Sequence, residues 1–261
     1  MSRLLKSYKT EINPTQEQKT KINKTIGTCR YMYNFYIAHN KELYDKGEKF
    51  LPYKKFSVWF NNEFIPNNPE YLWIKEVSSK SIKRSLENAN NAFSKFFNHE
   101  SNFPRFKKKG KSDVKMYFVK NDDKSIIHCE RHRIKIPTLG WVRIKEKGYI
   151  PTTKSGLVIK SGFVSKKADR YYVSVLVDIP ESIVDNNLDT GIGIDLGIKD
   201  LAVVSDGTKY KNINKNYKVK RLEKQLLKVQ RLYHRIDNIR TDYINKTILK
   251  ILKTKPSYIT I

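Results

Sequence analysis

The sequence has little cysteine, few acidic residues for its length and no long apolar run. Only Cys29 and Cys129 are present, far apart in the chain, which excludes a disulfide scaffold and a zinc ribbon built from these residues. No apolar run approaches the roughly 20 residues that span a membrane. The N-terminal stretch MSRLLKSYKTEI is also too polar for a secretory signal. We therefore expect a cytoplasmic protein without a membrane partner.

The shortage of acidic residues leaves a large positive charge. The 261 residues include 52 lysines and arginines against 26 aspartates and glutamates, a formal net charge of +26. Such an excess repels itself in a compact state and favours a polyanionic partner. The composition therefore predicts nucleic-acid binding, although charge does not separate RNA from DNA.

The N-terminal part of the chain predicts a strand followed by a long helix. Residues 3–12 alternate weakly between apolar and polar, and Asn13-Pro14 predicts a helix start with Asn as the N-cap. From Ile22 onward, apolar residues repeat at steps of four and three, which predicts one helix ending near Gly47. Its aromatic stretch CRYMYNFY is expected in the core, although Arg30 could face a nucleic acid.

A second helix and the basic segment after it form the predicted nucleic-acid surface. VWFNNEF predicts a short helix and IPNNPEYLW a loop, and Ser78 or Ser79 then caps a helix with one apolar face. In residues 102–113, NFPRFKKKGKSD, aromatics that can stack on bases interleave with cations that can neutralise phosphates. A solvated helix face and a disordered linker are the alternative interpretations, but Pro104 between two phenylalanines favours an ordered segment. The candidate binding residues here are Arg30, Lys80, Lys83, Arg84, Phe103, Arg105, Phe106, Lys107, Lys108 and Lys109.

From residue 114 to residue 180 the apolar period changes to two. Short alternating runs are separated by turn signals, and Lys167-Ala168-Asp169 predicts a hairpin turn. We expect a small antiparallel barrel closed by residues 3–12, so that the helical segment from residue 13 to about 110 is an insertion. His128-Cys129 is a cluster of two without further ligands, and a core position is expected for it rather than a metal site.

The stretch TGIGIDLGIKDLAVVSDG predicts a meander of strands around one carboxylate. Gly191 to Gly197 predict a buried strand with Asp195 near its end, and Leu201 to Val204 a second strand. Asp206-Gly207 is a hairpin signal, and Lys209 to Ile213 predict a third strand.

An ionised carboxylate in an apolar strand is costly unless it is paired, hydrogen-bonded or bound to a metal. Asp195 could simply accept hydrogen bonds from nearby backbone amides. The hairpin after it favours a metal site, since ribonuclease-H-like nucleases place their first metal-binding Asp on such a strand. Actin-like ATPases place a phosphate-binding hairpin there, so the motif indicates a superfamily rather than a reaction.

The remaining residues predict a polar linker, a long basic helix and a final strand. Residues 181–189 are the linker, and residues 218–253 show an apolar seam opposite a cationic face. Coiled-coil pairing is the structural alternative for this helix. Residues 257–261 have the pattern of an apolar strand, and the sequence looks unfinished there. The candidate binding residues on the helix are Lys224, Lys228 and Arg231.

Several motifs in this order carry a family resemblance that covers essentially the whole chain. They are YKTEINPTQEQKTKI, EVSSKSIKRSLENANNAFSKFF, NFPRFKKK, GIDLGIKDLAVVSDG, RLEKQLLKVQRLYHRI and YITI. The chain resembles the TnpB (OrfB) proteins of insertion sequences, which are RNA-guided nucleases related to type V CRISPR effectors. NFPRFKKK and GIDLGIKDLAVVSDG are specific in combination, whereas either one is a weak signal.

The resemblance implies an α+β fold of three parts. These are a wedge β-barrel (1–12 and 114–180), an inserted helical recognition domain (13–113) and an incomplete ribonuclease-H-like (RuvC) α/β domain (188–261). By the same resemblance, Asp195 is the first of three catalytic carboxylates and a Mg²⁺ ligand. The other two, and the family's zinc ribbon, would lie beyond Ile261. We therefore expect a chain truncated just before its second catalytic carboxylate.

The function expected from this resemblance is that of a transposon-associated nucleic-acid-binding protein that does not cleave by itself. Its partners would be a guide RNA from the element, DNA and a full-length family member. A nuclease-dead regulator of the element is the alternative. An actin-like ATPase would need a second phosphate loop and an adenosine site, which the sequence does not show. A non-functional fragment is the remaining possibility.

Overall fold

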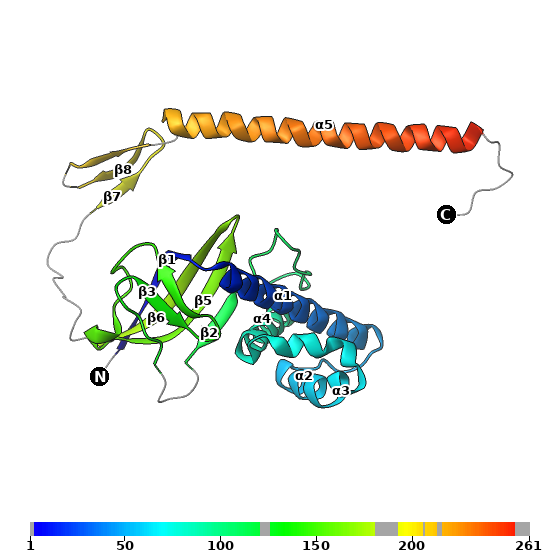
Figure 1. Cartoon of the computed structure of the whole chain (residues 1–261), viewed down its shortest axis with the longest axis horizontal. Coiled ribbons are helices and arrows are strands. Elements are labelled where there is room, and N and C mark those ends of the chain that lie inside the picture. Colours follow the sequence, from blue (N-terminus) through cyan, green and yellow to red (C-terminus); the bar gives the residue numbers. More distant parts are fainter. Residues whose placement is uncertain (1–2, 121–125, 181–192, 206, 213–215, 254–261) are drawn as a thin grey trace. The chain divides into compact units, whose positions relative to one another are not determined.

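The chain divides into two compact units, Met1–Asp185 and Asn186–Ile261. The computed structural model describes residues 3–120, 126–180, 193–205, 207–212 and 216–253 (Figure 1). Both units contain helix and strand, so the α+β class expected from the sequence is confirmed. No helix among these residues is long and apolar enough to cross a membrane.

The first unit contains a six-stranded antiparallel sheet with the order β2-β5-β6-β1-β4-β3. Its strands are β1 (Arg3–Asn13), β2 (Met116–Val119), β3 (Arg133–Ile136), β4 (Gly140–Ile144), β5 (Val158–Lys167) and β6 (Arg170–Pro180). β1 lies inside the sheet and pairs with β6 from Arg3↔Pro180 to Ile12↔Tyr171. N-terminal residues thus pair with the end of the period-two region, as the sequence predicts.

The described strands form an open ladder rather than the closed barrel expected from the sequence. β2 and β3 are its two edges, and each is only four residues long. β4 pairs with β1 through two residue pairs, Ile12↔Ile144 and Asn13↔Arg143. SIIHC contributes only an isolated bridge, Cys129↔Ile134, where a full strand was predicted. Because the edge strands β2 and β3 are short and β4 pairs with β1 through only two residue pairs, the described sheet does not close.

Period-two alternation places one face of the sheet in an aliphatic core. Val173, Val175 and Val177 of β6 are buried together with Ile134 and Val142 from the other end of the sheet. Full burial of such a side chain contributes about 1.5–3 kcal/mol. The predicted turn between β5 and β6 is present, with Lys167 paired to Arg170 and Ala168 at a φ of 54°.

The helices of the first unit are α1 and a group between residues 53 and 97. They are α1 (Gln16–Asp45), α2 (Tyr53–Trp59), the π-helix η1 (Phe60–Phe64), α3 (Ile65–Asn67), the 3-10 helix η2 (Pro69–Glu76) and α4 (Ser79–Phe97). One 3-10 turn, η3 (Thr153–Ser155), lies between strands β4 and β5. The predicted loop IPNNPEYLW is instead short helical turns, with prolines at their first positions, where the missing N–H has no intrahelical partner.

Helix α1 begins two residues later than the sequence predicts. Its N-cap is Thr15, whose side chain accepts a hydrogen bond from the Gln18 backbone while the Gln18 side chain accepts one from Thr15. This reciprocal capping box satisfies two free donors, which outweighs the Asn13-Pro14 signal. The C-terminal end agrees, with the helix ending at Asp45 and Gly47 following at positive φ.

Helix α1 joins two cores. Ile22 packs in the core of the sheet, whereas Met32 and Ile37 pack in an aromatic core with α2, η1 and α4. Tyr36 is at the centre of the second core, 4.9 Å from Phe56 between ring centroids, and its hydroxyl hydrogen-bonds to the Leu51 carbonyl. The core position predicted for CRYMYNFY is therefore confirmed.

The second unit contains the three-stranded sheet β7-β8-β9 and one long helix. The elements are β7 (Ile194–Leu196), β8 (Asp200–Val204), β9 (Lys209–Lys211) and α5 (Tyr217–Lys253). The meander and helix agree with the sequence, but the expected burial of the first strand is wrong, since Ile194 and Leu196 are 57% and 76% exposed. Three short strands in one layer cannot cover their own faces. The predicted linker 181–189 and final strand 257–261 lie outside the described residues.

Candidate nucleic-acid interface

The basic segment 102–113 is an ordered part of the first unit. The Asn34 side chain of α1 donates to the Lys107 carbonyl (2.9 Å) and accepts from the Lys107 amide (2.8 Å). Pro104 is buried, and the Phe103 ring lies 5.3 Å from the Phe96 ring. The disordered-linker interpretation is therefore wrong, because a paired backbone and a packed ring fix the segment on the helices.

Residues of this segment differ in the direction they face. Phe103 and Lys107 are half-buried, and the Lys107 ammonium lies 4.1 Å from the centre of the Tyr33 ring. Burial lowers the pKa of Lys107. Phe106 is 51% exposed. The predicted binding residues of the segment that are exposed and can meet a partner are Arg105, Phe106, Lys108 and Lys109.

The candidate cations on α1 and α4 also differ in their contacts. Arg84 forms an ion pair with Glu87 (3.0 Å) and stacks on Tyr117 at 4.5 Å. The Lys80 ammonium donates to the Lys120 carbonyl at 2.9 Å. Lys83 is exposed and Arg30 is half-buried. Among these predicted residues, Lys83 is the most available to a partner.

Arg84 and Lys107 line one small cavity of about 220 Å³. Asp113 and Lys115 also line it, and Phe163 of β5 closes it from the sheet. Opposite charges therefore meet inside this cavity. Two predicted binding residues thus contribute to the junction between helices and sheet.

Asp195 is exposed on β7, where it is paired in register with Val203 of β8. A two-metal phosphodiester cleavage needs several carboxylates to hold its ions. Among the described residues, no three His, Cys, Asp or Glu side chains are grouped closely enough to hold a metal ion. The described residues therefore do not by themselves fit a complete Mg²⁺ site.

Helix α5 presents both cations and apolar side chains to solvent. Lys224 and Lys228 are exposed, and the side chain of Arg231 lies outside the described part of the structure. Leu222 and Leu226 on the apolar seam are 64% and 59% exposed. The predicted seam is therefore present in the helix without a cover among the described residues.

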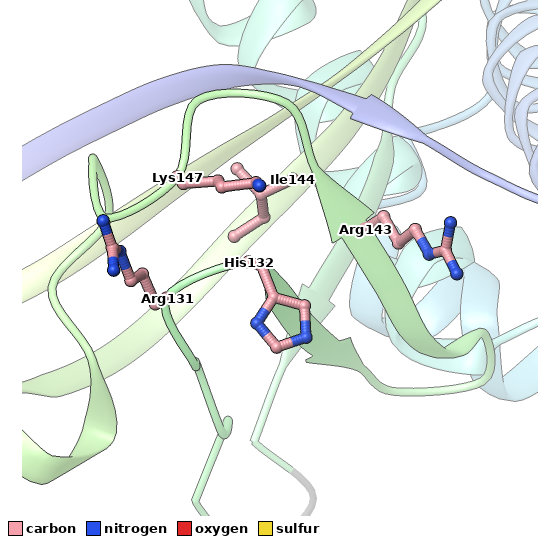
Figure 2. Close-up of a pocket in the computed structure, with 5 residues that line it drawn as sticks. All are labelled: Arg131, His132, Arg143, Ile144 and Lys147. Atoms are coloured by element: carbon pink, nitrogen blue, oxygen red, sulfur yellow. The ribbon is translucent and has the colours of Figure 1, made fainter.

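One group of basic residues was missed at the sequence level. Arg131, His132, Arg143 and Lys147 line a pocket of about 440 Å³ beside Ile144 (Figure 2). RHRIK and VRIKEKG, the runs that contain them, fit a strand pattern, and the sequence predicts only strands there. The clustering of basic residues within these two short runs is the sequence signal that could have indicated the pocket.

Comparisons with known proteins agree with the sequence motifs. Residues 1–49 match the family model HTH_OrfB_IS605, described as a helix-turn-helix domain. In the structure, β1 and one helix, α1, lie within the described part of this range, residues 3–49.

Two curated relatives cover most of the chain. It is 30% identical over 269 aligned positions to the "Putative RNA-guided DNA endonuclease InsQ" of Escherichia coli K12, covering 95% of this chain. It is 25% identical to the "Putative RNA-guided DNA endonuclease" of Streptomyces pristinaespiralis, covering 81% of this chain. The chain spans 64% and 51% of the length of these two relatives.

A shorter relative and a solved structure are also similar. The "Virulence protein VsdF" of Salmonella dublin is 29% identical, with 41% of this chain and 95% of that protein covered. The solved structure, titled "Cryo-EM structure of the Cas12f1-sgRNA-target DNA complex", superposes with a TM-score of 0.45 at 9% identity. That superposition covers 88% of this chain and 69% of the other.

Proposed function

The chain belongs to the TnpB (OrfB) family of transposon-associated proteins, and on that premise we propose that it binds a guide RNA from its element and DNA. The wedge sheet (1–12 and 114–180) and helical insertion (13–113) would hold the nucleic acid. Two relatives, each named as a putative RNA-guided DNA endonuclease, support this proposal.

The observation that carries the proposal is the fixed basic segment 102–113. Asn34 holds the backbone at Lys107, so Arg105, Phe106 and Lys108 project from a rigid support. Cations on a rigid support can neutralise several phosphates, and an exposed ring can stack on a base. Phe103 and Lys107 then act mainly by holding the segment in place.

We further propose that β7, β8, β9 and α5 are the start of a ribonuclease-H-like (RuvC) domain over residues 188–261, with Asp195 as a metal-binding carboxylate. Lys224, Lys228 and Arg231 would contact nucleic acid from α5. When bound, Mg²⁺ would supply Lewis-acid activation of the phosphodiester. Because Asp195 provides only one carboxylate, we expect residues 1–261 to bind nucleic acid without cutting it.

A salt titration of RNA binding tests the main proposal. Neutralising each phosphate of a single strand contributes about 0.7 to the slope of log affinity against log salt. The triple variant Arg105→Gln, Lys108→Gln, Lys109→Gln should therefore lower the slope by roughly 2. A matched triple, Lys41→Gln, Lys46→Gln, Lys49→Gln, removes equal charge near the end of α1 and should keep the slope. Equal losses in both variants would contradict a defined binding segment.

The nuclease-dead regulator remains a second candidate function, because no three His, Cys, Asp or Glu side chains among the described residues are grouped closely enough to hold a metal ion. Incubation of the purified 261-residue chain with Mg²⁺ and labelled DNA, with and without element RNA, separates the candidates. A regulator leaves the DNA intact while still shifting it in a gel. Cleavage that Asp195→Ala abolishes would instead show that the chain, as it stands, is a working nuclease.

A further inference from the structure

Four basic side chains gather at the β3–β4 end of the six-stranded sheet, and none of them belongs to segment 102–113. Arg131 and His132 precede β3, Arg143 belongs to β4, and Lys147 follows it. Together they line a pocket of about 440 Å³. All four are exposed, while Ile144 beneath them is 5% exposed. The pocket thus combines an apolar floor with a cationic rim.

Backbone hydrogen bonds hold the two sides of the pocket together. The Ile144 amide donates to the His132 carbonyl (2.8 Å), and the Gly148 amide donates to the Arg131 carbonyl (2.7 Å). Gly148 has a φ of 77°, a conformation that glycine adopts without strain. The chain after β4 therefore turns back beside residues 131 and 132, which makes the pocket a fixed feature of the fold.

Neighbouring cations of the sheet have acidic partners. Arg133 pairs with Glu130 (2.7 Å) and stacks on Trp141 at 4.4 Å. Lys145 pairs with Glu11 at 3.0 Å. These contacts neutralise charge on the same short strands that form the pocket.

The pocket cations differ from these neighbours. Within the described ranges, no acidic side chain forms an ion pair with Arg131, Arg143 or Lys147. Arg143 even lies directly opposite Arg133 in the ladder, an arrangement that is destabilising for like charges. An anionic ligand in this pocket would reduce the electrostatic repulsion between its unpaired cations.

We propose that this pocket binds successive phosphates of a nucleic-acid backbone, as a contact separate from segment 102–113. Figure 2 shows Arg131 and Arg143 on opposite sides of His132 and Lys147, so the cations flank the pocket rather than meeting at one point. Separated cations match a chain of phosphates better than one free phosphate ion. The exposed His132 ring and buried Ile144 offer a surface for a sugar between them. This inference rests on the proposed nucleic-acid binding.

The test compares two triple variants of the full chain in filter binding. Arg131→Gln, Arg143→Gln, Lys147→Gln removes the pocket cations, and Lys135→Gln, Lys154→Gln, Lys167→Gln removes the same charge from exposed positions on the same unit. With a labelled RNA hairpin, the pocket triple should lower the salt slope by roughly 2 to 3, because each neutralised phosphate contributes about 0.7 in a single strand and about 0.9 in a duplex. The control triple should leave the slope close to that of the parent chain.

A labelled DNA duplex in a parallel titration distinguishes the source of the phosphates. A slope change with the hairpin alone assigns the pocket to RNA, and a change with the duplex alone assigns it to DNA; either supports the proposal. Inorganic phosphate, added at constant ionic strength, should not displace the hairpin more than chloride does. Selective displacement by phosphate would overturn the chain-of-phosphates assignment in favour of a single-anion site.

Charge-conserving substitutions and a folding measurement show whether any loss of binding comes from lost charge or from unfolding. Arg131→Lys with Arg143→Lys should keep the parent slope, and circular dichroism should show the Gln triple folded. An unchanged slope in the pocket triple, or equal losses in both triples, overturns the inference while the Arg105, Lys108 and Lys109 result still stands. Failure of the parent chain to bind any probe would instead overturn the proposed function, and the inference with it.

Discussion

The two units use the same apolar pattern with opposite results. Val173, Val175 and Val177 alternate along β6 and are buried against the sheet core. Ile194 and Leu196 alternate along β7 in the same way, yet both are more than half exposed. Alternation therefore specifies a strand, whereas burial needs a second layer. Two experiments test this contrast between the units, and two more test contacts within the first unit, from the largest expected effect to the smallest.

Truncating a tyrosine in each unit should give the largest difference in the free energy of unfolding between the two units. Tyr36→Ala removes a ring that packs on Phe56 and a hydroxyl that donates to the Leu51 carbonyl and to the Asn90 side chain. We expect a loss of about 3–5 kcal/mol in the free energy of unfolding. Tyr217→Ala, at a 75% exposed position of α5, should stay within about 0.5 kcal/mol. Urea unfolding followed by far-UV circular dichroism, which reports the helices of both units, measures both, and similar losses would contradict the contrast.

Two glycines provide a test of packing density. A Cβ at Gly162 would lie 2.7 Å from the Ser174 carbonyl oxygen and collide with the Phe118 ring, so Gly162→Ala should cost about 1–3 kcal/mol. At Gly193 the nearest atom, Ser205 Cβ, would be 3.6 Å away, an ordinary contact. Gly193→Ala should therefore leave the thermal midpoint of unfolding almost unchanged. A destabilised Gly193→Ala variant would show that the second unit is packed more closely than its exposure indicates.

The Asn34 side chain provides a test of local order. Asn34→Ala removes both hydrogen bonds to Lys107 and should cost about 1–3 kcal/mol. Faster hydrogen exchange should be confined to residues 102–113, and RNA affinity should fall because the cations lose their support. Asn61→Ala, which removes a bond within its own helical turn, is the matched control. Unchanged exchange in the segment would contradict the fixing role of Asn34.

The smallest expected effect is a pH dependence from His39. Its ring stacks on Trp59 at 4.6 Å, and burial lowers the pKa of His39 below the ordinary 6.5. The unfolded chain then binds the proton at a higher pH than the folded chain does, so stability falls as pH falls below about 6.5. His39→Gln should flatten this dependence between neutral and mildly acidic pH. An identical pH profile in the variant would assign the dependence to other groups.

Periodicity made the order of elements predictable. The long helix, the strands from β2 to β6 and the meander around Asp195 were all visible because apolar repeats are local signals. The closure of the barrel was not predictable: β2 and β3 are unpaired edges among the described strands, and pairing between the ends of a sheet depends on strand length and tilt. The helix start was also misplaced, because the capping box of Thr15 and Gln18 competes with a neighbouring Asn-Pro signal.

The candidate site was less predictable than the fold. The sequence marked NFPRFKKK as basic and aromatic but could not show that Phe103 and Lys107 turn inward. It also missed the pocket at Arg131 and Arg143, because both residues fit a strand pattern. Side-chain direction in a segment without regular periodicity depends on contacts that are distant in the sequence.

The sequence by itself determined the positive charge, the α+β order of elements and the family, since composition and motifs are properties of the chain alone. Only the tertiary structure decided which cations are free to meet a partner. Asn34 reaches Lys107 across 73 residues, and residues 131 and 132 meet residues 143 to 147 only through the pairing of β3 with β4. Such contacts arise from packing and strand register, which no local pattern encodes.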